Sequence, residues 1–96
     1  MTQQLEIDGR LYNGVEIHTQ HAVMLLIQGE KANLGCGYFS LAPAEKLGDR
    51  FAIVTGVKNF AEMLEAIVID VSTAAIGSGV AVGMTGREAL NRMEKW

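Results

Sequence analysis

The residue best suited to covalent chemistry is the single cysteine, Cys36, which stands between two glycines and just before an expected helix. Flanking glycines let a ligand or another strand approach the backbone closely. A helix N-terminus nearby favours the thiolate, which is the nucleophilic form of a thiol. Cys36 is therefore a candidate catalytic nucleophile or oxidisable sensor. The alternative is a small buried residue at a strand end, a common role of free cysteine.

A catalytic thiol usually works with a base, and the two histidines, His18 and His21, are the available partners. On a helix their spacing would pair two metal ligands. Here it spans an expected turn between strands, and a zinc site needs three or four ligands. We therefore expect histidines that are exposed or hydrogen-bonded at a hairpin end, and no metal site.

The segment Gly83-Met84-Thr85-Gly86-Arg87 leads directly into the last expected helix. Free N–H groups and the helix dipole there could bind a small anion, with Arg87 as its counter-charge. The glycines before it lack the spacing of a phosphate-binding loop. In the alternative interpretation the glycines allow tight packing, Thr85 caps the helix, and Arg87 pairs with Glu88 or another surface acid.

Two further polar residues, Lys58 and Asp70, fall at or after the ends of expected strands. Ligands often bind at the carboxyl ends of strands in α/β sheets, so both are weaker site candidates. The plainer interpretation is that Asp70 bonds a neighbouring loop and that Lys58 is a solvated lysine.

The N-terminal region reads as strands. Alternating apolar residues predict strands at 4–8 and 11–18, separated by the tight-turn pair Asp8-Gly9. In the second of these strands we expect Val15 and Ile17 to point inward. The chain should therefore begin as an antiparallel hairpin.

The strand that follows, Ala22 to Ile27, is apolar at every position. A hairpin strand with one face in water should alternate between apolar and polar residues. We therefore expect both faces of this strand to be covered. A fourth strand is expected at 34–38.

The remaining chain alternates short strands with helices. Each expected helix follows a residue that can cap it: Ser40, Asn59, Ser72 and Thr85, the last in a capping box with Glu88. Gly48 should end the first helix. Strands or extended segments are expected at 51–54, 67–71 and 80–82. The last helix should present an apolar face: Ala89, Leu90, Met93 and Trp96.

These elements predict an α+β (mixed α/β) fold. An N-terminal antiparallel β-meander precedes short βα units, in a mixed sheet with helices mainly on one face. We expect one domain over residues 1–96, with a β-rich oligomerising region at 1–38 and alternating strands and helices at 39–96. Such a sheet leaves its other face apolar, and a second copy is the natural cover.

Composition excludes several classes of function. Of the 96 residues, 49% are hydrophobic and 20% are charged, which is more apolar material than one small core needs. The net charge of −3 and the lack of a Lys/Arg cluster argue against a nucleic acid or an anionic membrane as partner. No apolar run is long enough to span a bilayer, and no signal peptide is recognisable. A single cysteine fits the cytoplasm, and no cofactor is implied.

From Cys36 onward the chain resembles the YunC-like family of small bacterial and archaeal proteins of unknown function. The resemblance rests on Cys36-Gly37, Gly56-Val57, Met63-Leu64 and above all the segment from Gly83 to Leu90. It implies an N-terminal β region used for tetramerisation. It implies no catalytic residue, since no activity is established for the family. Family members carry an acidic residue where this chain has Ser40.

Three functions follow as hypotheses. The favoured one is a homo-oligomeric binding or interaction module without catalysis. The second is a thiol-dependent enzyme or redox sensor that uses Cys36, with Arg87 or Lys58 binding an anionic substrate. The third is an accessory subunit of a larger enzyme. The sequence does not decide whether the protein is an enzyme.

Overall fold

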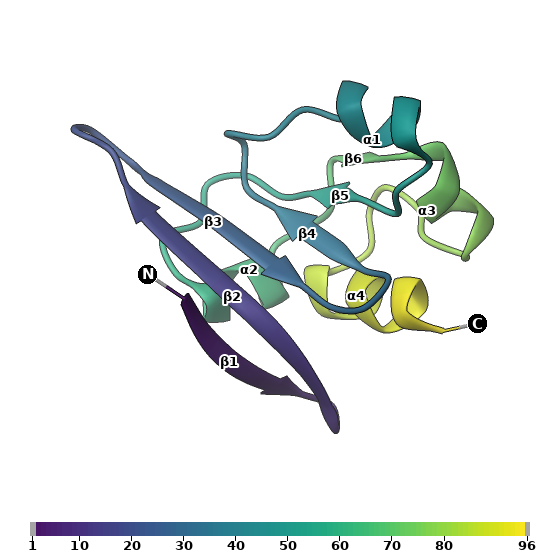
Figure 1. Cartoon of the computed structure of the whole chain (residues 1–96), viewed down its shortest axis with the longest axis horizontal. Coiled ribbons are helices and arrows are strands. Elements are labelled where there is room, and N and C mark those ends of the chain that lie inside the picture. The colour runs from purple at the N-terminus through teal and green to yellow at the C-terminus, as the bar shows by residue number, and fades with distance from the viewer. Residues whose placement is uncertain (1, 96) are drawn as a thin grey trace.

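The computed structural model describes residues 2–95, which form one six-stranded sheet and four helices (Figure 1). The strands lie side by side in chain order: β1 (Thr2–Ile7), β2 (Arg10–His18), β3 (Val23–Gln28), β4 (Asn33–Gly35), β5 (Ala52–Ile53) and β6 (Asp70–Val71). The helices are α1 (Ala42–Leu47), α2 (Phe60–Glu65), α3 (Thr73–Gly77) and α4 (Gly86–Glu94). Neighbouring strands are antiparallel except for the parallel pair β4–β5, which confirms the mixed sheet.

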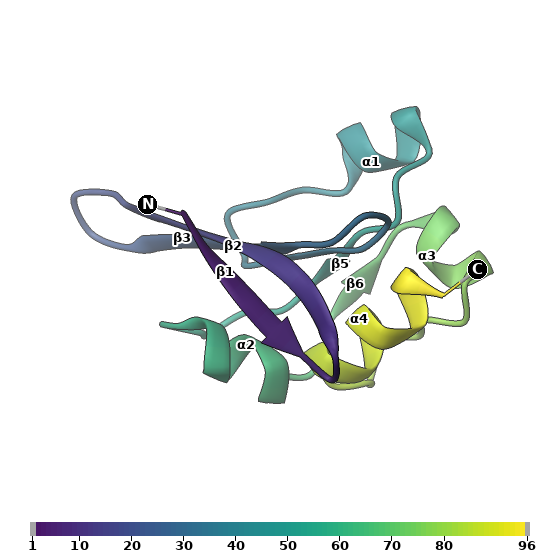
Figure 2. The same ribbon diagram turned by 60° about the horizontal axis from the view of Figure 1, so that its bottom comes forward.

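The core lies between the sheet and the two helices on its lower side. Figure 2 shows α2 and α4 on one side of the sheet and α1 on the other. The largest buried side chains of this core come from both the sheet and the helices: Tyr12, Leu25, Ile27 and Leu34 from the sheet, and Met63, Leu90 and Met93 from the helices. A Cβ atom on Gly14 of β2 would lie 2.8 Å from the Phe60 ring, so α2 packs directly on the strand.

The face of β2 that points to the core differs from the prediction. Tyr12 and Gly14 are buried, whereas Ile17 is 49% exposed and Val15 is partly buried on the opposite face. The two-residue turn at Asp8-Gly9 pairs Leu5 with Tyr12 and thereby fixes the register. The prediction that Val15 and Ile17 point inward is therefore wrong. Because both faces of β2 carry apolar residues, the alternation of apolar and polar residues along the strand did not show which face is buried.

Three of the four predicted helix caps are confirmed. Asn59 Oδ1 accepts the Glu62 N–H at 2.8 Å, and Thr85 forms the expected capping box with Glu88. Ser72 caps α3. Ser40 does not cap α1, whose N-cap residue is Leu41 in a helical conformation without a side-chain bond. The proline in the first turn of α1 has a fixed backbone angle φ that already suits a helix, and it has no N–H that would need a cap.

The later strands are shorter than predicted. The expected strands at 34–38, 51–54 and 67–71 reduce to β4, β5 and β6, and 80–82 forms no strand. Residues 67–68 pair with the segment before α4 instead, where Val68 N–H donates to Met84 O at 2.7 Å. Gly48 ends α1 in the left-handed conformation, as expected. Of the predicted inward residues of α4, Trp96 lies outside the described residues and the other three are buried.

Ser72 joins the segment before β5 to the first turn of α3 through one buried hydroxyl. Its Oγ accepts N–H bonds from Phe51 at 2.9 Å and Ala75 at 3.3 Å, and donates to Asp49 O at 2.8 Å. Because the Ser72→Ala change removes the partner of one buried and two partly buried groups, we expect it to lower the free energy of unfolding by about 2 kcal/mol. Urea denaturation measures the loss. Ser40→Ala is the matched control, because Ser40 is exposed and caps nothing, and an equal loss there would contradict the assignment.

Candidate functional site

A hollow of about 320 Å³ lies at the carboxyl ends of the two parallel strands. After β4 the chain leaves through Cys36, Gly37 and Tyr38, and after β5 it leaves through Thr55, Gly56 and Val57. These six residues and Val23 of β3 line the hollow. Ligands of open sheets often bind outside the carboxyl ends of parallel strands. The hollow is therefore the place in this fold best suited to a small ligand.

Cys36 forms part of the wall of this hollow and is 5% exposed. Its Sγ accepts the N–H of Leu25 at 3.3 Å, and its own N–H donates to Leu25 O at 3.1 Å. None of the seven lining residues is a histidine, a carboxylate or a lysine. The structure thus gives the thiol access to a hollow but places no base in the lining.

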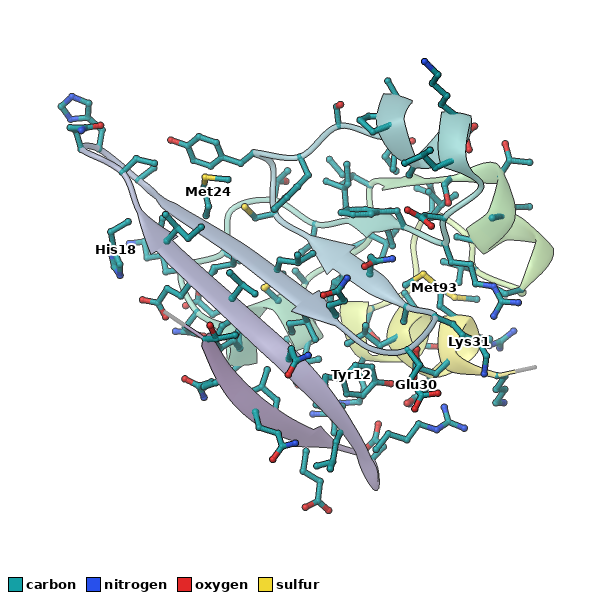
Figure 3. The ribbon with its side chains drawn as sticks, viewed as in Figure 1. Tyr12, His18, Met24, Glu30, Lys31 and Met93 are labelled. Carbon is teal, nitrogen blue, oxygen red and sulfur yellow. The ribbon has the colours of Figure 1, made fainter. Side chains whose placement is uncertain are left out.

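The two histidines lie at the far end of the β2–β3 ribbon, as expected. His18 Nε2 lies 2.6 Å from Glu16 Oε2, and His21 is exposed in the turn. Figure 3 shows His18 projecting from the end of β2. Within residues 2–95 no three His, Cys, Asp or Glu side chains gather in the way a metal ion would require.

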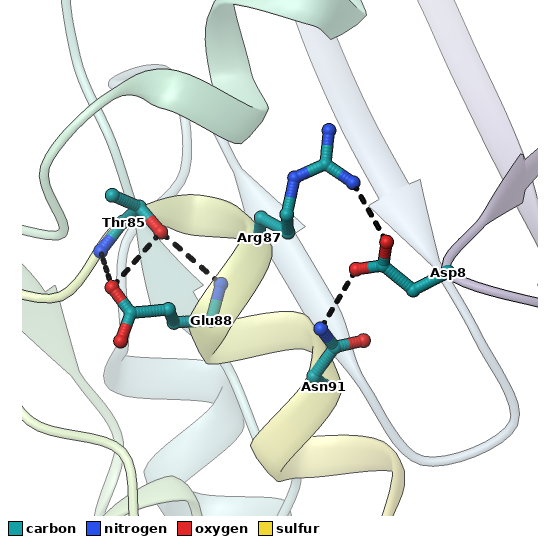
Figure 4. A network of polar contacts seen from close by, with 5 residues as sticks. All are labelled: Asp8, Thr85, Arg87, Glu88 and Asn91. Atoms are coloured by element: carbon teal, nitrogen blue, oxygen red, sulfur yellow. Dashed lines mark hydrogen bonds and ion pairs between the residues drawn. The ribbon is translucent and has the colours of Figure 1, made fainter.

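The residues of the predicted anion site are engaged within the chain (Figure 4). Thr85 Oγ1 accepts the Glu88 N–H at 3.2 Å, and Arg87 Nη1 donates to Asp8 Oδ1 at 3.0 Å. Asn91 donates to the other oxygen of Asp8 at 2.8 Å. The Asn91 hydrogen bond and the Arg87 guanidinium hold the pKa of Asp8 below its usual value. Arg87 therefore ties the β1–β2 turn to α4.

Other candidate residues stand apart from the hollow. Neither Arg87 nor Lys58 lines it, although Lys58 follows Val57 in the chain. The Lys58 N–H donates to Glu62 Oε1 at 2.7 Å, in front of α2. Asp70 is exposed, and its Oδ1 accepts the N–H of the next residue at 3.1 Å. The structure does not bring these charged groups to Cys36.

Sequence reasoning did not single out Glu94, near the end of α4. Its carboxylate accepts the backbone N–H groups of Lys31 and Ala32, each at 2.7 Å, and so caps the β3–β4 turn. Glu94 also lines a charged hollow of about 680 Å³ with Arg10, Leu11, Glu30, Lys31 and Lys95. Tyr12, labelled beside this turn in Figure 3, is buried, and burial together with the Glu94 charge raises its pKa. No chemical signal in the sequence marks this long-range capping contact.

The face of β1–β3 opposite α2 and α4, called here the open face, carries no helix from residues 2–95. Its side chains on β2 and β3 are largely apolar: Leu11, Val15, Ile17, Met24 and Leu26, with the polar Asn13 and Gln28 between them. Over β4 the same side of the sheet is covered by the Phe39 and Phe51 rings, both within 2.8 Å of a Cβ built on Gly35. The cover therefore ends at β3.

An apolar hollow of about 230 Å³ lies on the open face, lined by Val15, Ile17, Met24, Leu25, Leu26 and Phe39. We expected the strand from Ala22 to Ile27 to be covered on both faces. Within one chain, Leu25 and Ile27 are fully buried on the core side, while Met24 and Leu26 are only partly buried. One chain alone thus leaves the second face of β3 partly open.

The fold is that of a small mixed-sheet protein, and comparison with known proteins places it in a family. Residues 35–93 match the model described as "Domain of unknown function (DUF1805)", and the chain belongs to this family. It is 30% identical over 93 residues to the uncharacterized protein YunC of Bacillus subtilis, covering 93% of this chain and 92% of that protein. The YunC-like resemblance is therefore confirmed.

A solved structure shares the fold. The crystal structure of a protein of unknown function, TA1206 from Thermoplasma acidophilum, is 30% identical and superposes with a TM-score of 0.91. The match covers 97% of this chain and 91% of that chain, so the shared fold includes the N-terminal strands. The descriptions of these relatives state no activity. No helix within residues 2–95 combines the length and apolarity needed to cross a membrane.

Proposed function

We propose that this protein is a cytoplasmic, non-catalytic binding or interaction module that assembles with copies of itself through the open face. The observation that carries the proposal is that no helix of the described part of the chain covers the open face, where β3 presents Met24 and Leu26 beside Val15 and Ile17 of β2. Contiguous exposed apolar surface marks interaction sites in small proteins. Residues 1–38 form the assembling region in this proposal.

Energy favours covering this face. Each Å² of apolar surface removed from water contributes about 25 cal/mol. The face of an antiparallel sheet that stays in contact with water normally carries polar residues. The open face instead carries apolar side chains beside Ile17, which is itself exposed. The tetramer implied by the family resemblance is the assembly we favour.

Sedimentation velocity of the unmodified chain tests self-association. A chain of 10.4 kDa should sediment at micromolar concentration as a species several times that mass, and a tetramer is the expected one. A folded species of one-chain mass at every concentration would remove the proposal.

A second candidate function rests on the hollow at the ends of β4 and β5. In this proposal Cys36 acts as a nucleophile or oxidisable sensor toward a small ligand held against Tyr38 and Thr55. An anion site at Gly83-Met84-Thr85-Gly86-Arg87 would be separate from it and would require Arg87 to release Asp8.

Alkylation of Cys36 decides for or against this second function. A working thiol should react with iodoacetamide in the folded protein at pH 7 faster than free cysteine does. The comparison is the same protein in urea, where burial no longer protects the sulfur. If Cys36 reacts only after unfolding, it is a buried structural residue, and the thiol function fails while the assembly proposal is unaffected.

A further inference from the structure

Side chains on the open face are sorted into rows that run across the strands. Strand register places Ile17 opposite Met24 and Val15 opposite Leu26, which makes two apolar rows at one end of the face. The next row, called here the amide row, crosses four strands and contains only primary amides: Gln4, Asn13, Gln28 and Asn33. Beyond it, Leu11 pairs with Glu6. The face is therefore apolar at one end and amide-lined in the middle.

The amide row restricts what can cover this face. Within residues 2–95, the side chains of Gln4, Asn13 and Gln28 form no hydrogen bond, while Asn33 donates to Arg50 O at 2.9 Å. Burying an amide without a partner costs about 1–3 kcal/mol. A purely apolar cover, such as a lipid surface, is therefore disfavoured. The covering surface must offer donors and acceptors beside an apolar patch.

A second copy of the same face meets this requirement. A primary amide has both donors and an acceptor, so an amide row is complementary to another amide row. A surface that contacts its own copy about a two-fold axis must be complementary to itself, and a row of primary amides meets this condition. The spacing between the rows also matches, because the apolar rows and the amide row occur in the same order on the open face of the second copy.

We infer that two copies stack their open faces about a two-fold axis parallel to β2 and β3, so that apolar rows cover apolar rows and the amide row covers the amide row. This inference rests on the self-association proposed above. The apolar hollow between β2 and β3 puts the axis between these strands, with Val15 of one copy facing Leu26 of the other. Glu6, on the edge strand β1, stays at the rim in water.

An axis perpendicular to the strands fits worse in either position. Placed over Asn13, it would set each strand on its own counterpart, so that Leu26 of β3 meets the polar turn after Gln28 and Glu6 of β1 meets Thr2. Placed over the apolar rows, it would set the amide row against the turn after β2. It would also leave Leu11, which is 59% exposed, uncovered.

Cross-linking distinguishes the three arrangements. Asn13→Cys and Ile17→Cys, each made in a Cys36→Ala background, place a thiol in the amide row or in the outer apolar row, about 14 Å apart along β2. With the axis parallel to the strands, each introduced thiol lies close to the equivalent thiol of the second copy, across the interface. A perpendicular axis over Asn13 does so only for Asn13→Cys, and one over the apolar rows only for Ile17→Cys.

With a short bis-maleimide, both variants should therefore give covalent dimer as the predominant product. Lys58→Cys, exposed in front of α2 on the opposite side, is the control and should give none. Sedimentation of each variant runs in parallel. Dimer from only one variant, or from neither, in samples that still assemble overturns the axis and leaves the self-association proposal in place. Monomeric sedimentation of the unmodified chain refutes both. If Cys36→Ala alone disturbs assembly, Cys36→Ser replaces it as the background.

Discussion

Leu26→Glu should convert the assembled protein to monomers without unfolding the chain. Leu26 lies in the middle of the open face, opposite Val15, and its side chain is only partly buried within one chain. In a monomer the new carboxylate therefore reaches water. In the assembly the carboxylate would be buried without a positively charged partner, so nothing would offset the free-energy cost of removing it from water. We expect self-association to weaken by at least about 100-fold, or about 2.7 kcal/mol.

Sedimentation measures the mass of this variant, and far-ultraviolet circular dichroism reports whether it is folded. Leu47→Glu is the matched control, because it makes the same substitution at a leucine that is 74% exposed at the end of α1, away from the open face. Unchanged assembly of Leu26→Glu, or equal dissociation of both variants, would contradict the assigned interface. If Leu26→Glu unfolds, Ile17→Glu makes the same test at a more exposed position.

Gly86→Ala should have the largest effect on the stability of the chain itself. A Cβ atom on Gly86 would lie 2.1 Å from the Met63 carbonyl oxygen and 2.9 Å from a Leu34 methyl group. The carbonyl belongs to the backbone of α2 and cannot rotate away, so α4 and α2 must separate. Overpacking of this kind costs about 3 kcal/mol, a large part of the stability of a small domain.

The control for this substitution is Gly77→Ala, near the end of α3. Within residues 2–95, no atom beyond the chain neighbours and the backbone of α3 itself lies within 4 Å of a Cβ built there, so alanine should leave stability unchanged or raise it by about 0.5 kcal/mol. Urea unfolding of both variants gives the two free energies. Equal stabilities would show that the close contact of α2 with α4 is not what requires glycine at position 86.

Local signals in the sequence predicted much of the fold. Asn59, Ser72 and Thr85 cap helices as expected, because capping depends on residues three positions apart. The face of β2 was predicted wrongly because both of its faces carry apolar residues. Combining the two-residue turn at Asp8-Gly9 with the inward Leu5 and Ile7 would have resolved it.

The candidate site was harder to predict, because its contacts join distant parts of the chain. Arg87 was assigned to an anion, yet its partner Asp8 lies 79 residues away. Gly86 belonged to the same candidate, and its close contact with the carbonyl of Met63 depends on how two helices cross. Cys36 was placed correctly before α1 at a strand end, but the hollow beside it exists only because β4 and β5 are parallel neighbours.

Oxidation of methionines by peroxide tests most directly whether the open face is buried between copies. Met24 lies on the open face and Met84 in the segment before α4, and both are partly buried within one chain. Met63 and Met93 are fully buried and give the baseline. Mass spectrometry of peptides should show that Met24 is protected in the assembled protein and becomes reactive on dilution to monomers, while the Met84 rate stays constant. A Met24 rate that is the same in assembled and diluted protein would contradict the account.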